Sequence, residues 1–128
     1  MKYIVRIFLL SLLLLSFQCD EDVNADNAIT PEMLAIKKQE ILEYISTFSC
    51  NEASNCLYIA FGAKPCGGPR EFLVYPNTVD QSTLESMVND YYDMDNLYNI
   101  QTNAVSDCMV VGPPNTIDCV NNTCTIID

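Results

Sequence analysis

The chain has 128 residues, 49% of them hydrophobic, with seven cysteines, no histidine, no tryptophan and a formal net charge of −11. The missing histidine excludes Ser-His and Cys-His catalysis and histidine-ligated zinc. With 17 acidic and 6 basic residues, little positive charge is present to neutralise nucleic-acid phosphates. We therefore expect one domain that is not an enzyme, carries no cofactor and binds no nucleic acid.

Residues 1–18 have the pattern of a signal peptide. Lys2 and Arg6 supply a basic start, and the run from Ile7 to Leu15 is apolar apart from Ser11. A membrane-spanning helix needs roughly twenty apolar residues, so this run is too short for a stable span and matches the apolar region of an export signal. A short membrane anchor is the alternative interpretation.

Cys19 directly follows this apolar segment, and the segment with its cysteine resembles a bacterial lipoprotein signal. The resemblance implies that Cys19 becomes the first residue of the mature chain and carries acyl groups. The run Asp20-Glu21-Asp22 is similar to signals that send lipoproteins to the outer membrane or the cell surface. We expect an acidic tether at residues 19–28 and a folded domain at 29–128. Loss of residues 1–18 leaves 4 basic and 17 acidic groups, a formal charge of −13.

The folded domain is predicted to begin with a helix. Thr30 fits the N-cap position, and Pro31 fits the first turn, where its missing N–H is harmless. Apolar residues then recur at helical spacing as far as Phe48, where we expect the helix to end. The predicted apolar stripe consists of Leu34, Ile41, Ile45 and Phe48.

Two short runs of β type follow, Leu57–Gly62 and Phe72–Tyr75, with a loop rich in Gly and Pro at residues 63–70. A second helix is expected to start at Ser82, because Ser82 and Glu85 have the spacing of a capping box. Its predicted apolar face consists of Leu84, Met87, Val88, Tyr91 and Tyr98.

The last part of the chain predicts a strand at Cys108–Val111 and a hairpin over about Thr116–Ile127, with Asn121 and Asn122 at its turn. This order of elements indicates an α+β fold. We expect a small antiparallel sheet with two helices on one face and three disulfides.

Six cysteines remain when Cys19 is set aside, and an even number in a small exported domain indicates disulfides. Cys119 and Cys124 face each other across the predicted hairpin, where the strands come close enough for a bridge. Cys50 and Cys56 flank a short polar loop that they could close. Cys66 and Cys108 would then be the long-range pair. A metal site is the alternative, and the absence of a CxxC pair argues against it.

The run Ile59-Ala60-Phe61-Gly62-Ala63-Lys64-Pro65-Cys66-Gly67-Gly68-Pro69 resembles the signature of a family of small secreted or lipid-anchored bacterial proteins. Ser106-Asp107-Cys108 and the terminal Cys119-x-Asn121-x-x-Cys124 hairpin are further matches. No activity is established for this family. The resemblance therefore supports the disulfide pairing more than any function.

The same loop is the best candidate for a binding site. A proline-stiffened loop held by a cysteine loses little entropy on binding. We expect a non-catalytic binding or inhibitor-like module in which Lys64 or Arg70 enters the specificity pocket of a secreted hydrolase. The alternatives are a tight turn beside a disulfide and a structural surface component without a specific ligand, which predicts an even acidic surface without an apolar patch. The candidate residues are Lys64, Pro65, Gly67, Gly68, Pro69 and Arg70.

The acidic run from Asp90 to Asp95 is interpreted as a solvated helix face. A calcium loop would need a further oxygen ligand and then a glycine, where Leu97 and Tyr98 stand instead. Ser82 and Ser106 have no histidine to activate them. We expect no metal site and no catalytic residue.

Overall fold

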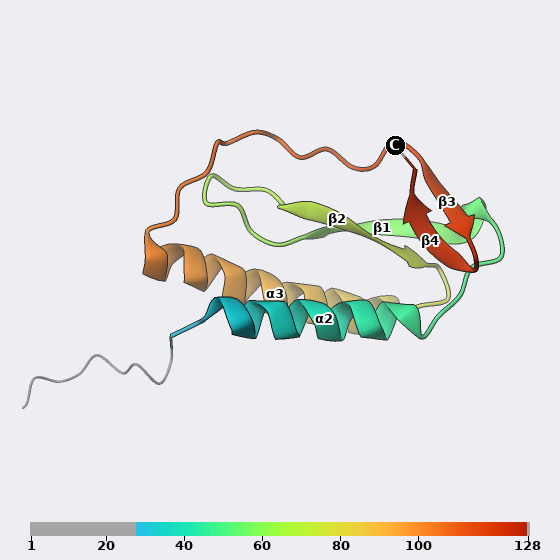
Figure 1. Cartoon of the computed structure of the whole chain (residues 1–128), viewed down its shortest axis with the longest axis horizontal. Coiled ribbons are helices and arrows are strands. Elements are labelled where there is room, and N and C mark those ends of the chain that lie inside the picture. Colours follow the sequence, from blue (N-terminus) through green and yellow to red (C-terminus); the bar gives the residue numbers. More distant parts are fainter. Residues whose placement is uncertain (1–27, 128) are drawn as a thin grey trace, which may run out of the picture.

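In the computed structural model, residues 28–127 are described, and the predicted signal peptide, Cys19 and most of the tether lie outside them. The element order is α2 (Pro31–Ser46), η3 (Ala53–Asn55), β1 (Cys56–Phe61), β2 (Glu71–Pro76), α3 (Gln81–Thr102), β3 (Ile117–Val120) and β4 (Thr123–Ile126). Figure 1 shows α2 and α3 side by side on one face of the β1–β2 ribbon, with the β3–β4 hairpin at one end of it. The predicted α+β class is confirmed.

The first helix begins as the sequence predicts. The Thr30 hydroxyl oxygen accepts a hydrogen bond from the Met33 N–H at 3.3 Å, and Pro31 occupies the first turn. The helix ends at Ser46, two residues before the predicted position, because the Thr47 hydroxyl and N–H both bond to the Tyr44 carbonyl. Phe48 therefore lies beyond the helix, although it still packs against the core.

The second helix begins one residue earlier than predicted, and its N-cap is Asp80 rather than Ser82. The Asp80 carboxylate accepts the Thr83 N–H at 2.8 Å, and these bonds from Thr83 lower the pKa of Asp80. The predicted capping residue was wrong because an ionised carboxylate is a stronger acceptor than a hydroxyl and is favoured at the positive end of a helix. At the other end, Asn103 adopts the left-handed conformation with φ 49°.

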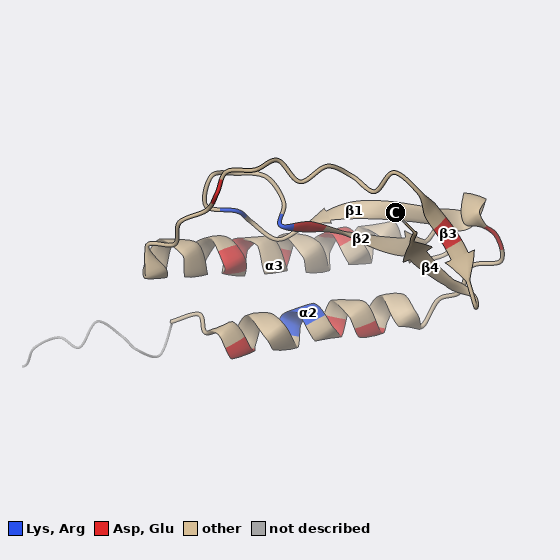
Figure 2. Cartoon of the chain, turned by 45° about the horizontal axis from the view of Figure 1, so that its top comes forward, with Lys and Arg blue, Asp and Glu red and all other residues tan. Residues whose placement is uncertain are grey.

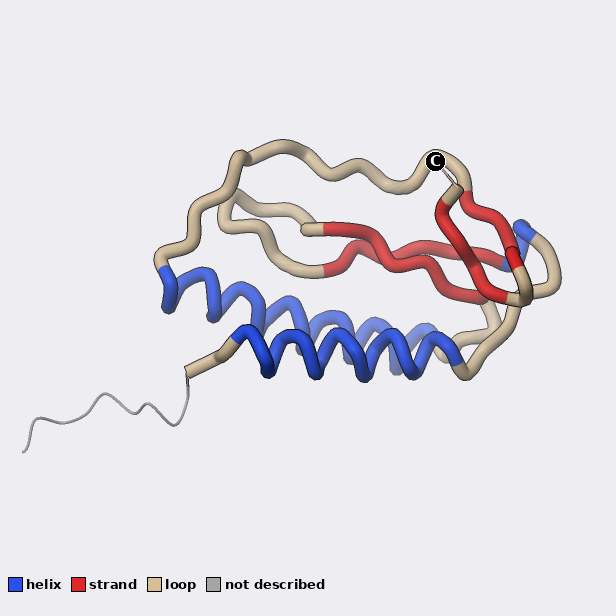
Figure 3. The backbone as a smooth tube through the Cα atoms, in the orientation of Figure 1, coloured by secondary structure: helices blue, strands red, loops and turns tan. Residues whose placement is uncertain are grey.

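Two antiparallel ribbons replace the single predicted sheet. β1 pairs with β2, with Ile59 opposite Leu73, and β3 pairs with β4. Asn121 and Asn122 have φ of 51° and 63°, so the predicted turn of the closing hairpin is confirmed. The predicted strand at Cys108–Val111 is wrong: residues 103–116 form an irregular segment, here called the strap, that runs from α3 to β3 (Figure 3).

The core lies between the two helices and the inner face of β1–β2. The rings of Phe61 and Tyr91 stack at its centre, with their centroids 4.1 Å apart, and burial raises the pKa of Tyr91. The buried cluster consists of Leu34, Ile41, Ile45, Phe61, Leu73, Tyr75, Val79, Leu84, Val88 and Tyr91. Most of these residues belong to the predicted apolar stripes and strands.

Three disulfides connect the six cysteines, and the pairing differs from the prediction in two of them. Cys66–Cys108 is confirmed, whereas the other bridges are Cys50–Cys119 and Cys56–Cys124. The predicted pairs 50–56 and 119–124 were wrong because the segment before β1 lies against the hairpin, where the Cys50 N–H donates to the Asn122 carbonyl at 3.1 Å. Cys50 and Cys56 therefore each form a disulfide with a cysteine of the hairpin.

These long-range bridges constrain the unfolded chain more than local ones. Sequence separations of 69 and 68 residues correspond to about 4.4 kcal/mol each in the chain-entropy estimate, against about 2 kcal/mol for a loop of roughly six residues. One bridge attaches the terminal hairpin to Cys50, ahead of η3, and the other attaches it to Cys56, the first residue of β1. They hold a hairpin that would be marginal by itself.

Candidate functional site

The polar centre of the molecule lies where α3 meets the loop between β1 and β2. Asp95 and Asn99 stand one helical turn apart on α3 and are 2% and 6% exposed. The Asp95 carboxylate accepts the Ala63 N–H at 2.7 Å, and the Asn99 amide donates to the Ala63 carbonyl at 2.8 Å. Both backbone groups of Ala63 are therefore bonded to one face of α3.

Arg70, at the other end of the loop, binds the same two side chains. Its Nε and Nη2 donate to the two carboxylate oxygens of Asp95 at 2.7 and 3.0 Å, and Nη2 also donates to the Asn99 amide oxygen at 2.8 Å. The hydrogen bond with Asp95 raises the pKa of Arg70. Since both ends of the loop bond to one turn of α3, the base of the loop has a single geometry.

The sequence pattern does not predict this site, because the run from Asp90 to Asp95 indicates a solvated helix face. That interpretation holds for the exposed Asp90 and Asp93 and is wrong for Asp95. A signal was present: Asp95 and Asn99 follow Val88 and Tyr91 at spacings of three and four residues, which places them on the apolar stripe of the helix. A carboxylate on a buried stripe requires a cation, and Arg70 supplies it.

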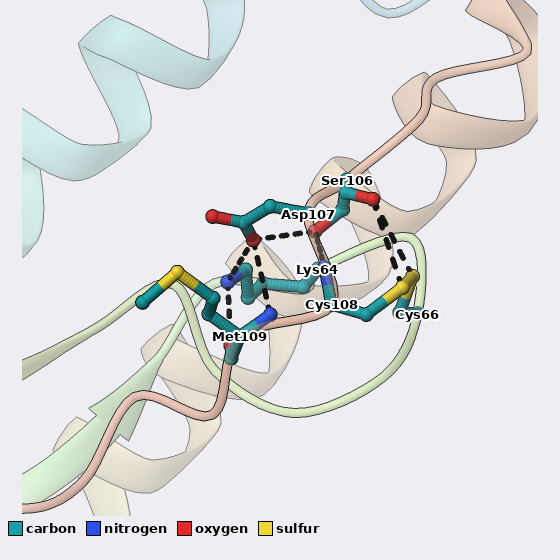
Figure 4. Close-up of a disulfide and its surroundings, with 6 residues drawn as sticks. All are labelled: Lys64, Cys66, Ser106, Asp107, Cys108 and Met109. Atoms are coloured by element: carbon teal, nitrogen blue, oxygen red, sulfur yellow. Dashed lines mark hydrogen bonds and ion pairs between the residues drawn. A yellow bond between two sulfur atoms is a disulfide. The ribbon is translucent and has the colours of Figure 1, made fainter.

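The middle of the loop is attached to the strap, as Figure 4 shows. The Lys64 ammonium donates to the Asp107 carboxylate at 3.0 Å and to the Met109 carbonyl at 2.7 Å. The same carboxylate accepts the Met109 N–H, and the Lys64 bond lowers the pKa of Asp107. The Cys66–Cys108 disulfide lies beside these contacts, so covalent and ionic links hold the same two segments together.

The tip of the loop is a tight turn that projects into solvent. The Lys64 N–H donates to the Gly68 carbonyl at 2.9 Å, and the Gly67 N–H donates to the Lys64 carbonyl at 2.8 Å. Gly67 and Gly68 have φ of 91° and 81° and are exposed, with no atom within 4 Å of an added Cβ. The tip is therefore open backbone on a fixed base.

Apolar side chains are exposed on the strap that is bonded to this loop. Val105 and Val110 are each 94% exposed, and Met109 is 68% exposed. Lone exposed apolar residues are common on protein surfaces, but these three flank Cys108, which is bonded to the loop. The loop tip and these three side chains lie on two segments joined by the Cys66–Cys108 disulfide and are together called the tip surface here.

Both candidate cations form ion pairs with carboxylates of the same chain. The Lys64 side chain is 14% exposed and pairs with Asp107, and the Arg70 side chain is 41% exposed and pairs with Asp95. Either side chain would have to leave its carboxylate before it could enter a hydrolase pocket. The remaining predicted loop residues, Pro65, Gly67, Gly68 and Pro69, complete the turn between them.

Acidic residues outnumber basic ones along the described chain, as the coloured ribbon shows (Figure 2). Residues 28–127 include twelve acidic and four basic residues, and each of the four cations lies in an ion pair. Besides Lys64 and Arg70, Lys37 pairs with Glu40 and Asp90, and Lys38 pairs with Glu71. Throughout the described residues, the charge left without a counterion is therefore acidic.

Potential metal-ligating atoms cluster at one place in residues 28–127. The sulfur atoms of Cys50, Cys56 and Cys124 lie within 4.8 Å of one another. All three belong to disulfides and so offer no thiolate to a metal ion. This group is the junction of two bridges.

Comparisons of the chain with protein-family models, with curated proteins and with solved structures find no match. Among the helices that the structure describes, none combines the length and the hydropathy needed to cross a bilayer. The function is therefore argued from the site itself.

Proposed function

We propose that this chain is a lipid-anchored lipoprotein of the bacterial envelope whose domain binds a partner protein, without catalysis, through the tip surface. The observation that carries the proposal is the exposure of Val105, Met109 and Val110 beside a rigid loop. Apolar side chains around a preformed turn gain affinity at a low entropic cost, because neither the loop nor the strap has to be ordered on binding.

The proposed location follows from Cys19 and is supported by the bridges. Three disulfides fit an oxidising compartment outside the cytoplasm. Acyl chains on Cys19 would hold the domain at the outer membrane or the cell surface, on a tether whose acidic residues keep it off anionic lipid. Incorporation of a fatty-acid analogue should be lost in Cys19→Ala, and labelling that persists would contradict the anchor.

A partner with a basic contact surface fits the excess of acidic residues. A secreted hydrolase remains the proposed kind of partner. In the folded geometry, the contact with it would come from the tip backbone and the valines, since Lys64 and Arg70 are held by carboxylates. The competing proposal is a structural surface component without a ligand. It requires that replacement of the exposed valines has no effect on the binding of any protein.

The test compares capture of envelope and secreted proteins by the immobilised domain and by two variants. Val105→Gln with Val110→Gln replaces the two most exposed apolar side chains of the tip surface without touching the core, and we expect it to lose the partner. Ile36→Gln, at a site 60% exposed on α2, is the matched control and should retain it. Equal retention by both variants would remove the tip surface from the proposal.

A further inference from the structure

The outer edge of β2 has unpaired backbone groups. The Asn77 N–H donates to the Asn55 carbonyl at 2.7 Å, in register with the ladder that continues at Cys56 and Pro76. Hydrogen-bonded and non-hydrogen-bonded pairs alternate in an antiparallel ladder. The N–H and C=O groups of Phe72 and Val74 must therefore point away from β1.

Pro76 agrees with this assignment. Like Phe72 and Val74, it occupies a non-hydrogen-bonded position of the ladder, so its missing N–H costs no bond to β1. Prolines in sheets occupy such edge positions. Beyond the ladder with β1, the Pro76 carbonyl accepts a hydrogen bond from the Val79 N–H at 3.0 Å, and none is described for the outward groups of Phe72 and Val74. The edge thus presents two donors and two acceptors, which are the N–H and C=O groups of Phe72 and Val74.

Two cavities beside β2 are together called the groove here, and β4 contributes to the lining of both, with Thr123 and Cys124 in one and Ile126 in the other. One part, of about 310 Å³, lies between α2 and β2, with Leu42, Ile45 and Phe48 on the helix wall. The other part, of about 520 Å³, lies between the start of β2 and the strap, with Val111 among its lining residues. Phe72 lines both parts.

We propose that this groove binds an extended segment of a basic partner protein, which adds a third strand to the β2 edge. Main-chain groups spaced along an edge are matched by another extended chain, and a helix beside the edge supplies contacts for alternate side chains. The lining is apolar at Leu42, Phe48 and Val111, so the inserted strand carries apolar residues on the sides that face these walls.

The groove lining carries one cation and one carboxylate, Arg70 and Glu71. The preference for a basic partner comes from the surrounding described residues, in which every cation has an acidic partner and the uncompensated charge is acidic. The same charge opposes a second copy of this chain as the occupant, since two acidic surfaces would face each other. The groove is separate from the tip surface. This inference therefore does not depend on the proposed function.

The test uses the purified protein with a synthetic peptide of ten residues that alternates lysine and valine. A glutamate-valine peptide of the same length is its control. Amide hydrogen exchange, read residue by residue, should slow at Phe72 and Val74 when the basic peptide is added, and the acidic peptide should leave it unchanged. Protection that appears elsewhere, or at neither amide, would overturn the proposal.

A pair of proline variants tests the edge directly. Val74→Pro removes an outward N–H from β2, and Ala60→Pro removes the equivalent outward N–H from the opposite edge of the ribbon, so neither change breaks the ladder. Val74→Pro should weaken peptide binding about tenfold or more, and Ala60→Pro should preserve it. Equal affinities would refute the proposal, as would dimers of the unliganded protein that Val74→Pro dissolves.

Discussion

Removal of the Arg70 guanidinium should destabilise the domain more than any other loss of a surface cation in residues 28–127. Arg70→Ala leaves the Asp95 carboxylate, 2% exposed, with the Ala63 N–H as its remaining hydrogen-bond donor. It also leaves the Asn99 amide oxygen without the donor that now meets it at 2.8 Å. The substitution therefore leaves the negative charge of Asp95 buried without a cationic partner.

The magnitude follows from the burial of the two partners. Breaking a fully buried ion pair costs about 3–5 kcal/mol. The Arg70 side chain is 41% exposed, so water enters the vacated space and stabilises part of the carboxylate charge. We therefore expect a loss near the lower end, about 3 kcal/mol in the free energy of unfolding. Lys37→Ala, which breaks two contacts of 3.8 Å on the surface, should cost less than about 1 kcal/mol.

Urea denaturation with disulfides intact measures both losses. The double variant Arg70→Ala, Asp95→Asn completes a double-mutant cycle. An asparagine at position 95 is uncharged, so the loss of Arg70 leaves no unpaired charge there. The double variant should be more stable than the sum of the two single losses predicts. If Arg70→Ala costs no more than Lys37→Ala, or if the two changes are additive, the pair does not hold the loop base.

Three further outcomes follow from the same contacts. Gly62→Ala should cost about 1–2 kcal/mol in the same assay, because φ is +77° and the new Cβ would lie 3.1–3.2 Å from the Arg70 methylene carbons, whereas Gly112→Ala should be neutral. The pKa of Asp107 is lowered in the fold. Its stabilising contribution is therefore present above the unfolded pKa of about 4 and is lost as the pH falls below that value. Asp107→Asn should differ from wild type in the free energy of unfolding at pH 6 and not at pH 2. Replacement of Cys50 and Cys119 by serine should cost about 4 kcal/mol, and peptide mapping that recovers a 50–56 bridge would contradict the pairing.

Local chemistry made most of the elements predictable. Thr30 and Pro31 define the start of a helix, and Asn121-Asn122 defines a turn that needs two positive φ angles, as the structure has. The Met-Val-Val run after Cys108 has the same β propensity as the real strands. It forms no strand because no neighbouring strand of the described fold pairs with it, and propensity does not supply a partner.

The disulfides and the polar site depend on tertiary contacts. Two cysteine pairs with similar local spacing can bridge within each segment or between segments, and the choice is made by the contact of the segment before β1 with the hairpin. Asp95 and Arg70 are 25 residues apart, and nothing local links them. The loop was found from its Gly and Pro content, but the bonds that immobilise it could not be assigned without the fold.

The most direct test of the central claim, that the domain acts by binding through its tip surface, is site-specific photocrosslinking on intact cells. A photoreactive residue at position 110, where Val110 is 94% exposed, should give one discrete adduct with a partner protein. The same residue at position 36 on α2 should give none. Absence of an adduct at 110, or the same adducts from both positions, would contradict the account.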